Sequence, residues 1–344
     1  MRYLGLRIKQ SVLVLVLLTV LLAPGFSVAD GLSSCMAEQM AKASDSTTMG
    51  ELRAVCAKQA GNEASVVQAE PVQNEETSVV DARLNIDRRN VLQPFTLMSH
   101  KPNYILVGAY NKAGYSAEHF QEQFDNPLVE FDDTEVQFQL SIKAPLAVDV
   151  FDTFDIYAAY TNRSFWQLYN SDLSAPFRET NHEPEAWVQF TPDWEIFGFR
   201  NSANALGFVH QSNGRGGVLS RSWNRVYANF VFQRGNFALG FKPWIRISED
   251  IEFDDNPDIT DYMGHYELRA GYKWKNHVFS IMSRNNLESG FERGAVELGW
   301  SFPLWKYPYF KGYIQYFGGY GESLIDYNNR VNRIGIGISL TDWL

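Results

Sequence analysis

This sequence has few cysteines, no excess of positive charge and only one long apolar run. Each of these shortages limits the possible functions. Only two of the 344 residues are cysteines, and the formal net charge is −10. A nucleic-acid partner is not expected, because phosphate binding needs an excess of Lys and Arg. The one long apolar run, residues 11–22, is shorter than the roughly 20 residues that a membrane-spanning helix needs. Any membrane insertion of the rest is therefore expected to use strands.

That apolar run belongs to a predicted export signal. Three basic residues precede it: Arg2, Arg7 and Lys9. A helix-breaking Pro-Gly pair at 24–25 and a small-residue site at 27–29 follow it. This is the pattern of a secretory signal peptide, with cleavage expected after Ala29. The alternative is a membrane anchor, which the short run disfavours.

Both cysteines lie just after the predicted signal. Cys35 and Cys56 enclose a segment that reads as two short helices around a polar turn. In an oxidising compartment we expect a disulfide to close this helical hairpin, residues 30–60. The alternative is a pair of unpaired thiols in a disordered tail. Residues 61–92 are polar and acidic and cannot bury enough apolar surface to fold alone, so they are predicted to be a flexible linker.

Residues 93–344 are rich in aromatic side chains and have the pattern of a membrane β-barrel. In residues 135–143, for example, Val136, Phe138, Leu140 and Ile142 alternate with polar residues. A period of two predicts strands with one apolar face toward lipid and one polar face toward the lumen. The alternative is a soluble β-sandwich, which would leave these bulky rows exposed to water.

About twelve such strands can be counted, and an even number suits a closed bacterial barrel. Their expected starts lie near residues 103, 134, 153, 184, 202, 222, 236, 262, 276, 291, 306 and 332. The sequence thus predicts an all-β, twelve-stranded antiparallel transmembrane barrel with a short N-terminal periplasmic extension. An inward row of charges is expected to fill its lumen: Lys242, Arg246, His265, Glu267, Arg269 and Lys273.

The segment 210–225 (HQSNGRGGVLSRSWNR) carries the most informative chemistry. By strand parity, His210 and Ser212 continue the lipid-facing row that contains Leu206 and Phe208. On the returning strand Asn224 continues the corresponding row, so a hairpin could bring it within reach of His210. Polar groups on the lipid side are costly unless they lie at the rim and bond to each other.

A serine, a histidine and an amide together form a plausible nucleophile, general base and orienting group. The Ser212 hydroxyl needs a neighbouring imidazole to take its proton, and His210 in turn needs its far nitrogen held by a group such as Asn224. The glycine-rich turn at Gly214 could direct backbone N–H groups at an oxyanion. The alternative is a set of ordinary surface residues near a loop.

The same segment closely resembles the active-site segment of bacterial outer membrane phospholipase A. Further matches are YTNRSFWQLYNSDLSAPFRETNHEPE (160–185), KPW (242–244), DDNPDITDYMG (254–264) and GYGESLIDYN (319–328). They extend in order from about residue 94 to the C-terminus. The resemblance implies a calcium-dependent phospholipase A1 and A2 in the outer membrane, which also cleaves lysophospholipids and is active as a homodimer.

The resemblance also assigns roles to individual residues. His210 falls on the catalytic histidine, Ser212 on the nucleophile, Asn224 on the orienting amide and Gly214 on the oxyanion-hole N–H. The implied Ca²⁺ ligands are the Arg215 carbonyl, the Ser220 hydroxyl, Asp255 and, from the second protomer, Ser174. An oxygen-only ligand set of this kind suits calcium.

The sequence departs from the family at a few positions. Gly216 and Gly217 stand where relatives often have a polar or acidic residue, which puts a weaker calcium site there in doubt. Asn162 stands where a longer glutamine is common at the dimer face. Trp343 and Leu344 end the chain in place of a terminal phenylalanine.

Some polar residues are predicted to have no catalytic role. The remaining histidines show no paired spacing typical of zinc sites and are expected to be ordinary barrel or loop residues: His100, His119, His182, His265 and His277. Glu179 and Glu183 are expected to be loop or rim acids. A non-catalytic barrel, either a small channel or a structural protein, remains the rival to a lipid hydrolase.

Overall fold

The computed structural model describes residues 78–344, except 92, 94–95, 253 and 306. The predicted signal peptide and the Cys35–Cys56 hairpin lie outside the described residues. The helical elements are α4 (Val79–Val91), α5 (Glu118–Phe124), α6 (Ile259–Met263) and the 3-10 turn η1 (Gly217–Leu219). Within the described part, no helix is both long and apolar enough to cross a membrane.

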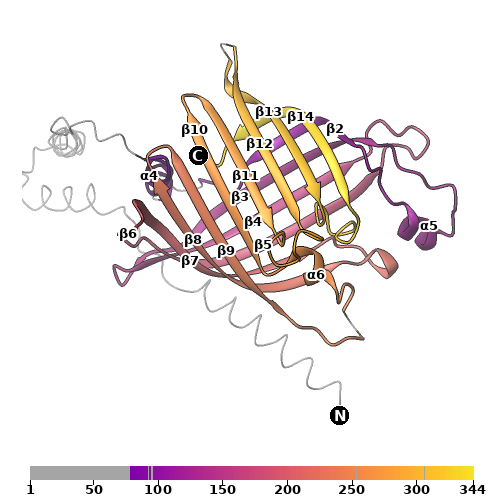
Figure 1. Ribbon diagram of the computed structural model, residues 1–344, viewed down its shortest axis with the longest axis horizontal. Coiled ribbons are helices and arrows are strands. Elements are labelled where there is room, and N and C mark those ends of the chain that lie inside the picture. Colours follow the sequence, from indigo (N-terminus) through magenta and orange to yellow (C-terminus); the bar gives the residue numbers. More distant parts are fainter. Residues whose placement is uncertain (1–77, 92, 94–95, 253, 306) are drawn as a thin grey trace, which may run out of the picture. The chain divides into compact units, whose positions relative to one another are not determined.

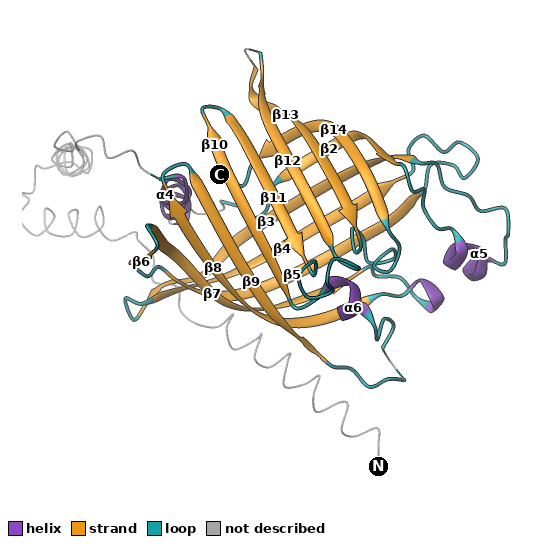
Figure 2. Ribbon diagram, viewed as in Figure 1, coloured by secondary structure: helices purple, strands orange, loops and turns teal. Residues whose placement is uncertain are grey.

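Antiparallel strands make up most of this part of the chain (Figures 1 and 2). The first seven are β1 (Met98–Ser99), β2 (Asn103–Asn111), β3 (Thr134–Val150), β4 (Phe154–Trp166), β5 (Phe177–Phe190), β6 (Trp194–Ile196) and β7 (Phe199–Ser212). The others are β8 (Ser222–Arg234), β9 (Phe237–Ile247), β10 (Tyr266–Trp274), β11 (His277–Arg284), β12 (Ala295–Leu304), β13 (Tyr307–Gly319) and β14 (Val331–Thr341).

The sheet closes on itself. Strand pairing runs from β3 through β2 and β14 down to β7, β5 and β4, and the pairing of β3 with β4 completes the ring. The sheet has fourteen strands in the described residues, of which β1 and β6 are only two and three residues long. Twelve long strands therefore form the wall, and the predicted closed antiparallel barrel is confirmed. The largest difference from the predicted starts is at β5, which begins at Phe177 rather than near residue 184.

The two faces of the wall have opposite chemistry. On the outside, large apolar side chains remain exposed, such as Leu206 (58%), Phe208 (45%) and Ile336 (56%). On the inside, Glu135, Gln137 and other polar residues are fully buried. Side chains alternate along a strand, so both rows follow from the period of two in the sequence. The apolar face therefore points outward, as a membrane barrel requires.

Charged and aromatic side chains fill much of the lumen and leave a cavity of about 400 Å³. Lys242, Glu267 and Arg269 line this cavity as predicted, and the Arg269 guanidinium lies 2.7 Å from the Glu267 carboxylate. The prediction is wrong for His265, which precedes β10, is largely exposed and pairs with Glu288 in a loop. Arg246 also departs from the row, because it pairs with the loop residue Asp254 at 2.6 Å.

A helix occupies part of the segment predicted to be a flexible linker. Helix α4 covers residues 79–91 and is held against the barrel by polar contacts. Asp87 accepts a hydrogen bond from Lys143 at 2.6 Å, and Arg83 donates one to the Ser99 carbonyl at 2.6 Å. The linker prediction is therefore wrong for this part, because barrel groups stabilise a helix that its own composition could not.

The barrel has one end with short turns and one end with long loops. Helix α4 lies at the short-turn end, where the Val79 N–H donates to the carbonyl of Gly235 in the β8–β9 turn. The long connections, residues 112–133, 167–176, 213–221, 248–265, 285–294 and 320–330, all lie at the opposite end. Strand β7 ends and β8 begins at this loop end, so Ser212 and its neighbours lie there.

Candidate active site

The β7–β8 hairpin brings the predicted base and its orienting group together. His210 and Asn224 are directly paired in the sheet, and Nδ1 of His210 lies 2.9 Å from Oδ1 of Asn224. Both side chains lie on the outer face. Their opposite-parity neighbours, Gln211 and Arg225, line the internal cavity, whereas His210, Asn224 and Ser212 do not. The site is thus on the outer wall rather than in the cavity.

Glu249 defines the orientation of the Asn224 amide. The amide nitrogen of Asn224 donates to Oε1 of Glu249 at 3.0 Å. A carboxylate only accepts hydrogen bonds, so the amide nitrogen must face Glu249 and the amide oxygen must face His210. The imidazole then carries its proton on Nδ1, and Nε2 is left as the basic nitrogen.

Ser212 follows His210 in the same outward row. Its sheet neighbours are His182 on β5 and Ser222 on β8. Within the described residues the Ser212 hydroxyl makes no hydrogen bond, so the structure does not join it to His210 directly. The hydroxyl is free to turn, and catalytic contacts often tighten only when substrate is bound.

The loop after Ser212 is held rigidly over the end of β5. Asn213 organises it, because its amide nitrogen donates to the Leu219 carbonyl at 2.8 Å and its oxygen accepts from the Arg221 N–H at 3.1 Å. The guanidinium of Arg215 donates to the Arg178 carbonyl at 2.8 Å. Gly214 has φ +65°, a left-handed conformation that favours glycine. The loop therefore presents a fixed backbone beside Ser212.

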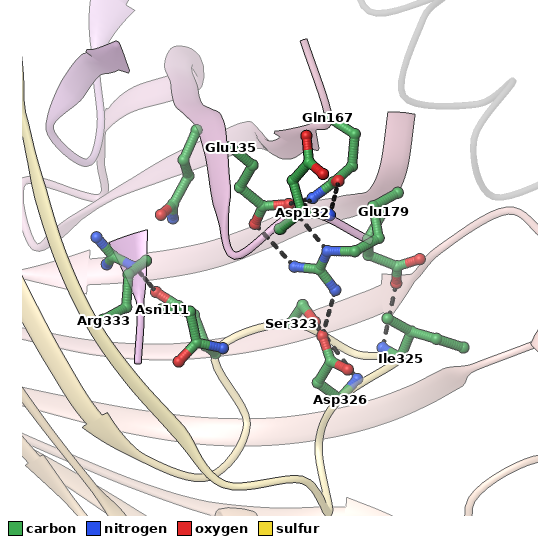
Figure 3. A network of polar contacts seen from close by, with 12 residues as sticks. Asn111, Asp132, Glu135, Gln167, Glu179, Ser323, Ile325, Asp326 and Arg333 are labelled. Carbon is green, nitrogen blue, oxygen red and sulfur yellow. Dashed lines mark hydrogen bonds and ion pairs between the residues drawn. The ribbon is translucent and has the colours of Figure 1, made fainter. Parts of the chain in front are cut away.

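Buried ionic contacts support the loop from inside the barrel (Figure 3). Arg178 on β5 pairs with Glu135 at 2.9 Å and also with Asp326 in the β13–β14 loop. Glu179 is fully buried in β5, accepts from the Ile325 N–H at 3.2 Å and lies 3.4 Å from Arg215. The prediction that Glu179 is a loop or rim acid is therefore wrong: it is a strand residue that anchors the loop 213–221.

Glu183, the other acid in that prediction, also lies within β5. Its carboxylate pairs with Lys101, and both side chains line the cavity in the lumen. The prediction is wrong here as well, because the strand begins seven residues earlier than expected and carries both acids into the wall.

Two of the predicted calcium ligands meet where the loop approaches the β9–β10 connection. The Ser220 hydroxyl donates to Oδ2 of Asp255 at 2.6 Å. The next residue, Asn256, is fully buried and accepts from the Ser222 N–H at 3.0 Å, which fixes this connection beside β8. Farther along, burial and the neighbouring Asp258 carboxylate raise the pKa of the Tyr327 phenol, so it remains a donor to Asp258.

The four predicted calcium ligands are only partly brought together. Ser220 and Asp255 are in contact, and Arg215 lies in the same loop as Ser220. Ser174 lies in the β4–β5 loop, is exposed, and its hydroxyl makes no hydrogen bond to any described residue. In the described part of the chain no three His, Cys, Asp or Glu residues cluster as a metal site. A metal here would therefore need hydroxyl and carbonyl oxygens in addition to the single carboxylate of Asp255.

Sequence reasoning missed two polar neighbours of the site. Glu249, which orients Asn224, lies in a loop with no recognisable pattern. His182 was predicted to be an ordinary barrel or loop histidine, yet it is paired with Ser212 across the sheet. No local sequence signal could identify either, because each reaches the site from a different strand or connection.

Comparisons with known proteins agree with this architecture. Residues 80–340 match the family model described as phospholipase A1. The chain is 39% identical over 295 residues to a phospholipase A1 from Klebsiella pneumoniae, covering 85% of this chain and 97% of that one.

Two solved structures are similar over the barrel. One is an outer membrane phospholipase dimer from Salmonella typhi with bound calcium (TM-score 0.65, 38% identity, 74% of this chain and 96% of that one). The other is an active-site mutant of outer membrane phospholipase A from Escherichia coli, with an asparagine changed to alanine (TM-score 0.67, 38% identity, 74% and 97%). The chain therefore belongs to the phospholipase A1 family and is an outer-membrane β-barrel phospholipase.

Proposed function

We propose that the protein hydrolyses the acyl ester bonds of phospholipids, at both ester positions and in lysophospholipids, with Ser212 as nucleophile and His210 as general base. The observation that carries this proposal is the 2.9 Å contact between His210 and Asn224 on the lipid-facing row that also contains Ser212. A related active-site variant has an asparagine replaced by alanine, which supports a catalytic role for an asparagine such as Asn224.

The geometry supports a two-step acyl transfer. Because Asn224 accepts the Nδ1–H of His210, Nε2 takes the proton from the Ser212 hydroxyl as its oxygen attacks the ester carbonyl. The backbone N–H of Gly214 stabilises the oxyanion that forms. His210 then returns the proton to the departing alcohol oxygen and leaves an acyl-serine. In the second step His210 takes a proton from a water molecule as the water oxygen attacks the acyl carbonyl, and then gives that proton to the departing Ser212 oxygen, which releases the fatty acid and restores Ser212.

Calcium fits the residues beside the nucleophile. The ligand set contains a carboxylate (Asp255), a hydroxyl (Ser220) and a backbone carbonyl (Arg215), and hard cations prefer such oxygens. When bound, calcium would supply a Lewis acid beside the ester carbonyl. The Salmonella typhi relative contains bound calcium, which supports the same cofactor here.

A homodimer is the proposed active state. Ser174 is exposed and its hydroxyl is uncommitted among the described residues, so it can serve as a ligand for a second protomer. The Salmonella typhi relative is described as a calcium-bound dimer. Asn162, on the outward row between Leu140 and His182, is the polar group proposed for the contact between protomers.

The nucleophile is tested by Ser212→Ala in purified protein, with fatty-acid release from mixed micelles at saturating calcium as the assay. We expect kcat to fall by several orders of magnitude, since triad members act as a unit. Ser222→Ala is the matched control, because Ser222 is the sheet neighbour of Ser212 and its hydroxyl makes no hydrogen bond within the described residues. Wild-type turnover in Ser212→Ala would refute the proposal.

The metal is tested separately by chelation. We expect excess chelator to abolish fatty-acid release, and added calcium to restore it, with no change in the heat-dependent gel migration of the folded barrel. Undiminished turnover in excess chelator would remove calcium from the mechanism while leaving the role of Ser212 intact.

A further inference from the structure

His182 lies against the reacting serine and the proposed oxyanion site. It is the direct partner of Ser212 in the β5–β7 pairing, so both side chains point to the outer face. A Cβ added to Gly214 would lie 3.8 Å from both Nε2 and Cδ2 of His182. The Nε2 edge of the imidazole therefore lies beside Gly214, on the side toward which a Cβ would project.

Two neighbours contact the Nδ1 atom of His182. The Tyr160 hydroxyl lies 2.6 Å from Nδ1, and the amide nitrogen of Asn162 lies 3.5 Å from the same atom. The amide oxygen of Asn162 accepts a hydrogen bond from the Ser164 hydroxyl at 2.9 Å, and its nitrogen faces His182. An amide nitrogen only donates, so with Asn162 in this orientation Nδ1 is the acceptor and Nε2 carries the hydrogen.

Ser212 thus lies between two histidines in opposite tautomers. His210 donates from Nδ1 to Asn224 and presents a bare Nε2, which can accept a proton. His182 accepts at Nδ1 and presents Nε2–H, which can only donate. Among the described residues this N–H has no acceptor. One imidazole is therefore suited to be the base and the other to bind a negatively charged oxygen.

We propose that His182 is a further catalytic residue, whose Nε2–H donates a hydrogen bond to the ester oxygen as it becomes the oxyanion, beside the N–H of Gly214. This inference rests on the proposed function of Ser212. No proton is transferred from His182: its N–H stays intact through both steps and only stabilises the charge. A donor that strengthens its bond in the transition state lowers the barrier without tightening substrate binding.

The test compares His182→Phe with His182→Gln. The phenylalanine keeps an aromatic ring but has no donor, whereas the glutamine places an N–H near the position of Nε2. Loss of one oxyanion donor can cost about 10²–10³-fold in kcat. Since Gly214 and the proposed calcium would remain, we expect a fall of about 10- to 100-fold in kcat for His182→Phe, an unchanged KM, and partial recovery in His182→Gln.

A third variant keeps the inference testable if His182→Phe does not fold. Tyr160→Phe removes the hydroxyl that faces Nδ1 and is expected to lower kcat by about twofold to fivefold with KM unchanged. In a His182→Gln background the same change should have no effect. An equal effect of Tyr160→Phe in both backgrounds would contradict the tautomer argument.

The outcomes separate this inference from the proposed function. If Ser212→Ala is inactive and His182→Phe keeps wild-type kcat, only the role of His182 is refuted. A higher KM with unchanged kcat would likewise overturn it, because that result indicates a lipid-binding group rather than an oxyanion donor. If Ser212→Ala retains turnover, the proposed function itself fails.

Discussion

Replacing Glu249 tests whether the tautomer of His210 depends on a residue that never touches the substrate. The Glu249 carboxylate accepts from the Asn224 amide at 3.0 Å and so keeps the amide oxygen toward His210. A hydrogen bond to a charged group contributes about 1.5–3 kcal/mol, and the half-buried position of Glu249 favours the low end. About 1.4 kcal/mol corresponds to a tenfold preference for one amide orientation.

Without Glu249 the amide can rotate and present its nitrogen to His210, which favours the wrong imidazole tautomer. We expect Glu249→Ala to lower kcat by about twofold if the two orientations become equally populated. The fall would reach about tenfold if the rotated amide gained the whole preference that Glu249 now supplies. Glu249→Gln, which still offers an acceptor oxygen, should lie between this variant and wild type.

The assay is fatty-acid release from mixed micelles at saturating calcium, with a double-mutant cycle over Glu249 and Asn224. In an Asn224→Ala background, Glu249→Ala should have no further effect, because it acts only through that amide. Glu252→Ala is the matched control, since Glu252 is an exposed acid in the same connection. If Glu249→Ala lowers kcat by the same factor in the wild-type and the Asn224→Ala backgrounds, the reasoning is refuted.

Two further predictions concern the proposed calcium ligands and the docked helix. Asp255→Asn should raise the calcium concentration for half-maximal turnover by about tenfold or more, because it removes the one carboxylate of the proposed set; an unchanged calcium titration would contradict this ligand. Asp87→Ala should release α4, since it leaves the nearly buried Lys143 ammonium without its 2.6 Å partner. Trypsin should then cut at Arg88 and Arg89 about 10- to 100-fold faster, which corresponds to a fall of about 1.4–2.8 kcal/mol in the free energy of local opening. Asn85→Ala, a substitution at an exposed position of the same helix, is the control and should be cut at the wild-type rate.

The sequence predicts the wall of the barrel well because alternation is a local property of each strand. Leu206, Phe208 and His210 share a parity that no distant contact can change, so the outward position of His210 follows from the sequence alone. The contact with Asn224 follows almost as directly, since the two residues lie on adjoining strands of one hairpin.

Contacts between strands that a hairpin does not join could not be predicted in this way. His182 meets Ser212 only because β5 pairs with β7 in one register, which depends on the connection that contains β6. Glu249 reaches Asn224 from a loop whose path depends on the buried Asn256 and its neighbours. Helix α4 was missed for a related reason: composition indicates whether a segment can fold alone, and Asp87 finds its partner on the barrel.

His210 and Ser212 lie on the outside of the wall, away from the cavity in the lumen, and this position has a consequence for substrate supply. Because these groups do not line the cavity in the lumen, substrate should reach them from the surrounding lipid, and the rate should depend on which lipids stand beside the loop end of the barrel. Turnover then reports the composition of one leaflet and the lateral diffusion of its lipids, rather than a concentration in solution. Changes in the order or asymmetry of the surrounding bilayer would act on the enzyme as directly as a change in its own residues.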